Sequence, residues 1–330
     1  MSKFGEPKSA IDNIVVSGAG SDAKEAEVRA EVSGHFAEKF SQQEIPELKG
    51  LERPPTSEEL QIFEFANRAT NKLLNRYGVA DFGLPTANIH VVPKVKWPTF
   101  KAKFNLGEGT GAFYHPDLQA IFCEEDPARL VVLEHAIHEM IHAKAFQSQN
   151  AVYYEDADEA TTEARRSGLG LRTRDGQWRF NLLDEAVTVE LQKLAAEDAR
   201  QDGLFAGETS ALKGFLAIRP EVAKKEPYAM HLIPVKNGET KELHVELTFR
   251  PYVRPRAALN KLVDALYACN QSDFQDREEV FDLFARAALT GRLLALGRLI
   301  EKTFGPGTFR QLGKCQTEED LEEFAKEIKV

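Results

Sequence analysis

The sequence is poor in cysteine and lacks long apolar runs, and each absence excludes a class of protein. Its three cysteines, Cys123, Cys269 and Cys315, are odd in number and far apart. This argues against a disulfide framework and favours reduced thiols in a cytoplasmic protein. No stretch approaches the roughly 18 apolar residues of a membrane span, and the N-terminus lacks the apolar core of a signal peptide. We therefore expect no membrane partner.

The sequence also lacks an excess of basic residues. Its net charge is −10, and no basic run is interleaved with aromatic residues, so a nucleic-acid partner is not expected. The glycine cluster at Gly107–Gly111 lacks the full dinucleotide-binding spacing and any following Lys-Ser/Thr pair, which excludes a phosphate-binding loop. What remains is the composition of an ordinary globular protein, long enough for one large domain or two modest ones.

The most informative feature that is present is the pentapeptide His138-Glu139-Met140-Ile141-His142. It lies in an apolar run, residues 128–146, without glycine or proline, which predicts a helix that is mostly buried. On a helix the two histidines lie one turn apart on the same face, so both imidazoles can reach one metal ion. Glu139 would project beside that ion, where it can serve as a general base. This is the HExxH pattern of zinc-dependent hydrolases.

A zinc site of this kind needs a third protein ligand. A second helix is predicted at residues 181–194, and Glu185 lies in its first turn among apolar residues. A carboxylate there would complete a set of two histidines and one glutamate. Glu159 and Glu163 are rival third ligands, since they lie closer in sequence to His142, although their segment is very polar and is typical of a solvated helix or loop. A β-hairpin turning at Asp175-Gly176 would connect the two helices.

The two segments together resemble the gluzincin metallopeptidases, the group that includes the thermolysin-like enzymes and the minigluzincins. In that group HExxH is followed by a second helix with an Asn/Asp-Glu-Ala/Gly-x-Thr-like run, matched here at residues 184–188. The resemblance implies a zincin-like catalytic domain, Zn²⁺ as cofactor, His138, His142 and Glu185 as ligands, and Glu139 as general base. The motif match covers about 60 residues, and a looser similarity of element order extends from about residue 57 to 195.

The sequence departs from this family at one position and leaves another open. Thermolysin-like enzymes place an aspartate one turn after the ligand glutamate, where it orients a zinc-bound histidine, but Val189 stands here. The orienting group would then be Glu134, Asp184 or a backbone carbonyl. The donor that stabilises the developing oxyanion is expected from a tyrosine or histidine elsewhere. Tyr252 is the leading candidate, with His231 as an alternative and Tyr153 and Tyr154 as weaker ones.

The rest of the chain divides into three parts. Residues 1–55 are polar and are expected to be a mostly disordered tail with a short helix near 23–40. Residues 56–205 would form the catalytic domain, which opens with a capping box at Thr56–Glu59. Residues 206–330 would form a mainly helical subdomain with a hairpin at 230–249 around Asn237-Gly238. Its helices are predicted over residues 255–268 and 276–303 and from the cap at Thr317 onwards.

Strands are predicted before the HExxH helix, and they give the catalytic part an α+β class. The three candidates span residues 88–93, 111–114 and 118–123. In the gluzincins an edge strand pairs with an extended substrate backbone, and here that role would fall to residues 111–114.

These expectations make the protein a zinc metallopeptidase acting on peptides or proteins. Two alternatives remain open. One is a zinc hydrolase of a non-peptide amide or ester, since the same metal chemistry serves both reactions. The other is a non-catalytic interaction protein that keeps the fold. Neither the substrate nor the oligomeric state follows from the sequence.

Overall fold

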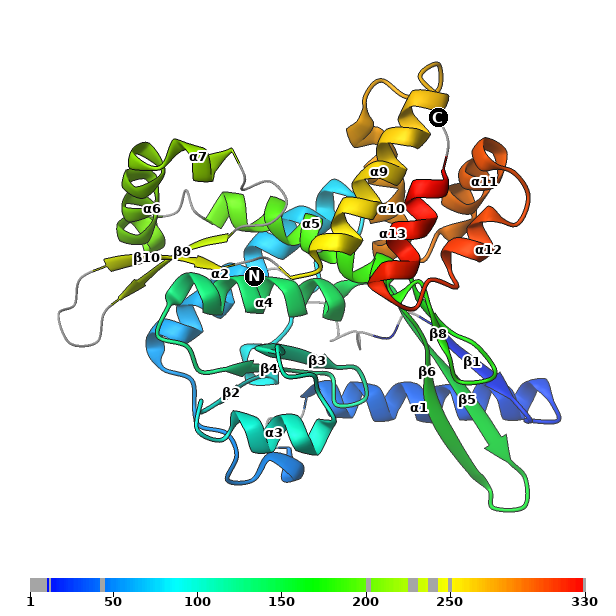
Figure 1. Ribbon diagram of the computed structural model, residues 1–330. Helices are drawn as coiled ribbons and strands as arrows, with labels where there is room; N and C mark the ends of the chain where they lie inside the picture. Colours follow the sequence, from blue (N-terminus) through cyan, green and yellow to red (C-terminus); the bar gives the residue numbers. More distant parts are fainter. Residues whose placement is uncertain are drawn as a thin grey trace, which may run out of the picture.

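Helix α4, Arg129–Lys144, lies at the centre of the fold, on one side of a small mixed sheet (Figure 1). The computed structural model describes residues 11, 13–41, 45–199, 203–224, 231–236, 243–248 and 251–328. The sheet has the order β2-β4-β3, with β4 parallel to β2 and antiparallel to β3. These strands are β2 (Ile89–Val92), β3 (Ala112–His115) and β4 (Ala120–Glu124). All three agree with the sequence prediction, and β3 is an edge strand as expected.

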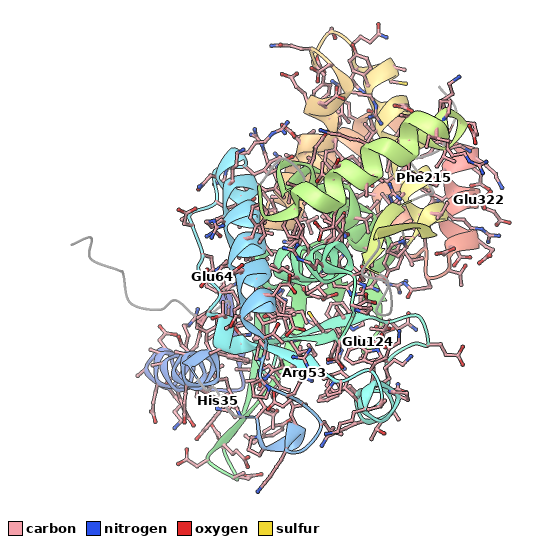
Figure 2. The ribbon with its side chains drawn as sticks, turned by 90° about the vertical axis from the view of Figure 1, so that its left-hand side faces the viewer. His35, Arg53, Glu64, Glu124, Phe215 and Glu322 are labelled. Atoms are coloured by element: carbon pink, nitrogen blue, oxygen red, sulfur yellow. The ribbon has the colours of Figure 1, made fainter. Side chains whose placement is uncertain are left out.

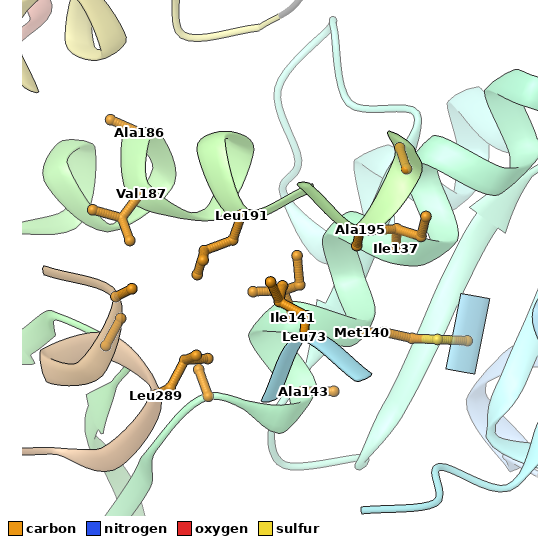
Figure 3. Close-up of a cluster of buried hydrophobic side chains, with 14 of the residues drawn as sticks. Leu73, Ile137, Met140, Ile141, Ala143, Ala186, Val187, Leu191, Ala195 and Leu289 are labelled. Carbon is orange, nitrogen blue, oxygen red and sulfur yellow. The ribbon is translucent and has the colours of Figure 1, made fainter. Parts of the chain in front are cut away.

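The other side of α4 is covered by helices α2, Ser57–Arg76, and α5, Asn181–Ala199. Thr56 and Glu59 form the predicted capping box at the start of α2. Apolar side chains of α4 and α5 interlock with neighbouring helices in one continuous core, and Figure 3 shows part of it, including Leu73, Ile137, Ile141, Val187, Leu191 and Leu289. Burying this many aliphatic side chains fixes the two helices against each other, at about 1.5–3 kcal/mol for each large side chain.

Arg53 fastens the N-terminal end of α2 to the sheet, and the side view shows it near that end of the helix (Figure 2). Its guanidinium donates to Glu59 on α2 at 2.8 and 2.7 Å and to Glu125 just after β4 at 2.9 Å. Its backbone also forms a bridge to Val91 of β2. Because bidentate guanidinium–carboxylate pairs are geometrically specific, this residue sets the position of α2 relative to the strands.

A second sheet, with the order β1-β5-β6-β7-β8, projects from the core, and helix α1 covers one of its faces (Figure 1). Its predicted hairpin at Asp175-Gly176 is present, with Gly176 at φ 79°.

Two expectations were wrong. Residues 13–17, expected to be part of a mostly disordered tail, are a strand, although the helix expected near residues 23–40 is present as α1; and the Glu159–Glu163 segment is a strand rather than a helix or loop. The elements are β1 (Asn13–Ser17), α1 (Asp22–Ser41), β5 (Gln147–Tyr154), β6 (Glu159–Ser167), β7 (Gly170–Arg172) and β8 (Trp178–Arg179).

These two errors have one physical cause. Few apolar side chains are buried between this sheet and α1. The core there consists of Ile14, Ala151, Val28, Val32 and Phe36. Strand β6 is polar along most of its length because its residues are largely exposed. A strand with so little to bury gives almost no alternation of apolar and polar residues to detect.

The C-terminal part is a group of helices that packs on α5. It comprises α9 (Val253–Cys269), α10 (Arg277–Thr290), α11 (Leu293–Phe304), α12 (Thr308–Leu312) and α13 (Glu318–Glu327). The single helix predicted over residues 276–303 was wrong, because it breaks at Gly291 into α10 and α11. Gly291 has φ 77°, the left-handed conformation that ends helices.

Replacement of Gly291 by alanine is expected to destabilise the protein by about 1–3 kcal/mol. The left-handed backbone disfavours any side chain, and a Cβ at this position would lie 2.7 Å from the Phe146 ring. Chemical denaturation measures the effect. Gly214→Ala is the matched control, because Gly214 is inside helix α6, Ala206–Ile218, with nothing within 4 Å of a Cβ. That change should be neutral or stabilising by up to about 1 kcal/mol, and equal effects at both positions would contradict the role of Gly291.

The remaining elements include the predicted second hairpin. Strands β9 and β10 pair antiparallel, and the Asn237-Gly238 turn lies outside the described residues. These elements are η1 (Pro46–Leu48), η2 (Thr86–Asn88), α3 (Trp97–Phe104), η3 (Gly203–Phe205), α7 (Pro220–Ala223), β9 (His231–Lys236) and β10 (Leu243–Thr248). The fold is therefore of the α+β class with small mixed sheets. All three cysteines are free, and none of the described helices has the length and apolar character to cross a membrane.

Candidate metal centre

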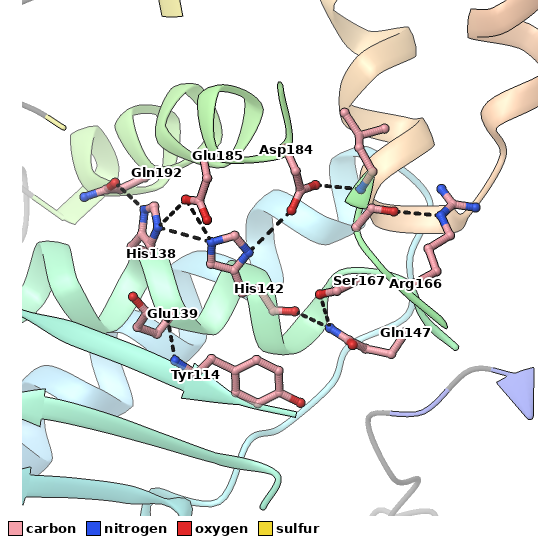
Figure 4. A network of polar contacts seen from close by, with 12 residues as sticks. Tyr114, His138, Glu139, His142, Gln147, Arg166, Ser167, Asp184, Glu185 and Gln192 are labelled. Atoms are coloured by element: carbon pink, nitrogen blue, oxygen red, sulfur yellow. Dashed lines mark hydrogen bonds and ion pairs between the residues drawn. The ribbon is translucent and has the colours of Figure 1, made fainter. Parts of the chain in front are cut away.

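Helix α4 brings His138 and His142 onto one face, as the spacing predicted, with Glu139 beside them. The Nε2 atoms of the two histidines are 3.2 Å apart. Helix α5 runs beside α4 and carries Glu185 in its first turn, so that its Oε2 atom lies 3.4 Å from each of those nitrogens. Figure 4 shows the two rings and the carboxylate pointing toward one another from the two helices. Among the described residues this is the group of His, Cys, Asp and Glu side chains placed to hold a metal ion.

The three atoms fit a tetrahedral zinc ion. Zinc bonds to nitrogen and oxygen are about 2.0–2.2 Å long, so ligand atoms around a tetrahedral ion are separated by about 3.3–3.6 Å. The triangle found here has edges of 3.2, 3.4 and 3.4 Å. Moreover, Glu185 Oε2 is buried and accepts no hydrogen bond within the described part of the chain. A buried carboxylate oxygen is costly unless a cation compensates it, and here that cation is either the pair of protonated rings 3.4 Å away or a metal ion in their place.

The outer nitrogen of each ring has its own polar partner. Gln192 of α5 places its Oε1 atom 3.1 Å from His138 Nδ1, and its amide nitrogen donates to Glu134 Oε2 at 2.7 Å. Asp184 Oδ2 lies 3.7 Å from His142 Nδ1. With an Nδ1–H directed at these oxygens, deprotonation of Nε2 would leave its lone pair facing Glu185, which is the tautomer that metal binding requires.

These partners take the orienting role for which the family uses an aspartate at the position of Val189. The sequence proposed Glu134, Asp184 or a backbone carbonyl as the orienting group. Asp184 does face His142, but His138 is contacted by Gln192, and Glu134 accepts a hydrogen bond from the amide of that residue. Gln192 was missed. It lies two helical turns after Glu185 on α5, and that spacing was the signal available in the sequence.

Glu139 is buried, at 7% exposure, and its carboxylate is held by strand β3. The backbone N–H of Tyr114 donates to Glu139 Oε2 at 2.8 Å. Burial raises the pKa of the Glu139 carboxyl, and the charge of Glu185 raises it further, while the two histidines and the Tyr114 hydrogen bond oppose the rise. The net rise brings a carboxylate closer to the range in which it can exchange protons near neutral pH.

The charges within the centre are strongly coupled. Burial alone would lower the pKa of His142, but Glu185 and Glu139 outweigh it and raise the pKa to about 10. The pKa of His138 is also raised, against its burial, by Glu185 and Glu139. For Glu185 the two histidines outweigh burial and hold the pKa of the carboxyl well below its usual range. The centre thus keeps the Glu185 carboxylate ionised and the imidazoles of His138 and His142 strongly basic.

Tyr252 lies beside this centre, at the residue that precedes helix α9. Burial raises the pKa of its phenol well above the usual range, and the nearby carboxylates of Glu185 and Glu139 raise it further. The phenol is therefore a protonated donor at neutral pH. Its backbone has φ 57° and ψ 39°, a left-handed conformation that costs a non-glycine residue free energy. Strain of this kind is concentrated at functional sites.

The other candidates from the sequence lie elsewhere or outside the description. Glu159 and Glu163 are exposed on β6, and Glu163 pairs with Arg172 at 3.0 Å, so neither belongs to the histidine group. Tyr153 and Tyr154 are on the projecting strand β5. His231 begins β9, and its side chain is not among those described.

Comparisons of this chain with protein-family models, with curated proteins and with solved structures gave no match. What the centre can do is accordingly inferred from its own side chains.

Proposed function

We propose that this protein is a zinc-dependent metallopeptidase of the gluzincin type, built on a zincin-like arrangement of an active-site helix, α4, and a glutamate helix, α5. His138, His142 and Glu185 would hold the ion. The observation that carries the proposal is the near-equilateral triangle of their ligand atoms, with a buried carboxylate, Glu139, adjacent to it on α4.

Each side chain has a distinct part in the proposed reaction. Zn²⁺, when bound, supplies Lewis acidity toward a carbonyl and lowers the pKa of a coordinated water. Glu139, fixed by the Tyr114 N–H, accepts a proton from the attacking water and delivers it to the leaving amine. Tyr252 donates its phenolic hydrogen to the carbonyl oxygen as negative charge develops there. Asp184 and Gln192 keep the histidine rings in position.

The edge strand favours an extended peptide as substrate. In an antiparallel pair, alternate residues direct their backbone groups to the partner strand. Gly111 O accepts from Glu124 N at 2.9 Å, so the backbone N–H and C=O groups of Gly111 and Phe113 are directed at β4. Those of Ala112 are directed at the open edge, beside Glu139. A peptide pairing with this edge would run past the centre by strand addition. This arrangement favours a peptide over a small amide or ester.

The proposal is tested by metal analysis of the purified protein and by incubation with a mixture of unstructured peptides, read by mass spectrometry. We expect about one zinc per chain and cleavage that stops on chelation and returns with zinc. Hydrolysis of small amides or esters without peptide cleavage would favour the non-peptide hydrolase. Bound zinc without any turnover would favour the non-catalytic interaction protein, and absence of zinc would overturn the assignment of the centre.

Tyr252→Phe is expected to lower kcat by about 10²-fold with little change in KM, because the lost hydrogen bond forms mainly in the transition state. Steady-state kinetics on one cleaved peptide measures both constants. Tyr154→Phe is the matched control, since Tyr154 is 51% exposed on β5, and it should leave both constants unchanged. An unaltered kcat in the Tyr252 variant would remove this residue from the reaction.

Zinc binding is expected to release protons at neutral pH. Without metal the pKa of His142 is raised to about 10, so its ring carries a proton that the ion must displace. Affinity should therefore fall as the pH is lowered, by about tenfold per pH unit for each proton released. Calorimetry in buffers of different ionisation enthalpy counts these protons. Binding without proton release would contradict the electrostatic coupling of Glu185 to the two rings.

A further inference from the structure

Arg166, at the end of strand β6, is a buried cation with three carbonyl partners. Its Nε atom donates to Gly168 O at 2.8 Å, Nη1 to Gly291 O at 2.6 Å and Nη2 to Ala287 O at 2.8 Å. Only 8% of the residue is exposed. The last two carbonyls belong to the C-terminal end of α10, where a helix leaves carbonyls unsatisfied and favours positive charge. Arg166 therefore joins the C-terminal helices to the turn after β6.

That turn contacts Asp184, the residue that faces His142. The N–H of Leu169 donates to Asp184 Oδ1 at 2.6 Å. Gly168 has φ +55°, and a Cβ there would lie 2.2 Å from the same oxygen. The turn thus packs directly against the carboxylate and leaves no room there for a side chain at position 168. Figure 4 shows the series of contacts from Arg166 through the turn to Asp184 and His142.

We propose that Arg166 is a positioning residue of the metal centre: it anchors the Gly168–Leu169 turn to α10, and the turn holds Asp184 in the orientation that directs His142 Nε2 at the ion. This inference rests on the proposed zinc function and adds a requirement to it, namely that residues of α10, which supply no ligand, help to build the centre. Nothing in the HExxH motif or the glutamate helix contains that requirement.

The geometry distinguishes positioning from simple stabilisation. Among the described contacts Arg166 makes none with the three ligand atoms, and its hydrogen bonds lead to the centre through the turn. Asp184 Oδ1 accepts from Leu169 N–H at 2.6 Å, which leaves Oδ2 as the oxygen that faces His142 Nδ1. Outer partners of this kind change metal affinity by about 10- to 100-fold when they are altered. A purely structural arginine would change stability and leave the affinity of the folded protein unaltered.

The test is zinc affinity of the full-length protein, measured by competition with a chromophoric chelator, together with the visible absorption spectrum of the Co²⁺-substituted protein. Arg166→Met is expected to bind zinc about 10- to 100-fold more weakly and to change the Co²⁺ spectrum. The zinc affinity of Arg166→Lys should lie between those of the wild type and Arg166→Met, because an ammonium cannot satisfy three separated carbonyls at once. Arg166→Lys provides the test if the methionine variant fails to fold.

Two controls separate the outcomes. Arg172→Met removes an arginine of β7 whose side chain forms an exposed ion pair with Glu163, and Val280→Ala removes buried volume from α10 without touching Arg166. Both should keep wild-type affinity, although Val280→Ala should unfold more easily. Wild-type affinity in a folded Arg166 variant would overturn the positioning role while leaving the zinc proposal intact. Failure of the wild-type protein to bind zinc or Co²⁺ would overturn both.

Discussion

Glu139→Gln is expected to abolish measurable peptide cleavage, with a loss of about 10³-fold or more in kcat, while zinc remains bound in stoichiometric amount. The variant keeps the shape of the side chain and an oxygen that can accept the Tyr114 N–H. It removes the only property that the proposed reaction requires of this residue, which is the ability to take up and return a proton. General acid–base groups contribute about 10²–10⁴-fold, so the loss should be among the largest that one substitution produces here.

The measurement combines zinc analysis with single-turnover kinetics on one cleaved peptide. Glu125→Gln is a suitable control, because Glu125 is a surface carboxylate after β4 whose described ion pair is with Arg53 and not with a residue of the centre. That variant should cleave at the wild-type rate. Retained cleavage in the Glu139 variant would show that another group activates the water, and loss of zinc would show that Glu139 holds the ion rather than the proton.

The parts of the centre that the sequence predicted are those encoded within single helices. Helical periodicity alone places His138 and His142 on one face, with Glu139 beside them, and the apolar flanks of residues 128–146 make that helix a buried one. Glu185 was predicted from the pattern of its own segment. That its Oε2 atom lies 3.4 Å from both rings depends on how α4 and α5 pack, which no local pattern contains.

What the sequence could not predict are the contacts between segments far apart in the chain. Gln192 reaches His138 because α5 lies along α4, and Arg166 reaches Ala287 and Gly291 across more than a hundred residues of sequence. Such partners have no fixed spacing from the residues they support. The strand β6 was missed for a related reason, since a polar strand is defined by its pairing with β5 rather than by alternation of its own residues.

The loss of Glu185 should affect the centre most directly. In Glu185→Gln the ion would keep two neutral imidazoles but lose the anionic ligand, and the amide is a poor substitute for a carboxylate. Affinity should therefore fall by more than the roughly 10- to 100-fold typical of altered outer partners. Activity should disappear with the metal rather than with a chemical step, which separates this variant from Glu139→Gln.

Thermal unfolding with and without zinc gives a readout that does not depend on finding the substrate. A ligand at about a thousand times its Kd stabilises the folded state by about 4 kcal/mol, so zinc should raise the Tm of the wild-type protein clearly and that of Glu185→Gln little. Glu163→Gln is the matched control, because Glu163 was the rival ligand in sequence and lies exposed on β6; its response to zinc should equal that of the wild type. If the Glu163 variant instead loses the response and the Glu185 variant keeps it, the third ligand comes from β6, and the triangle of atoms between α4 and α5 is not the metal centre.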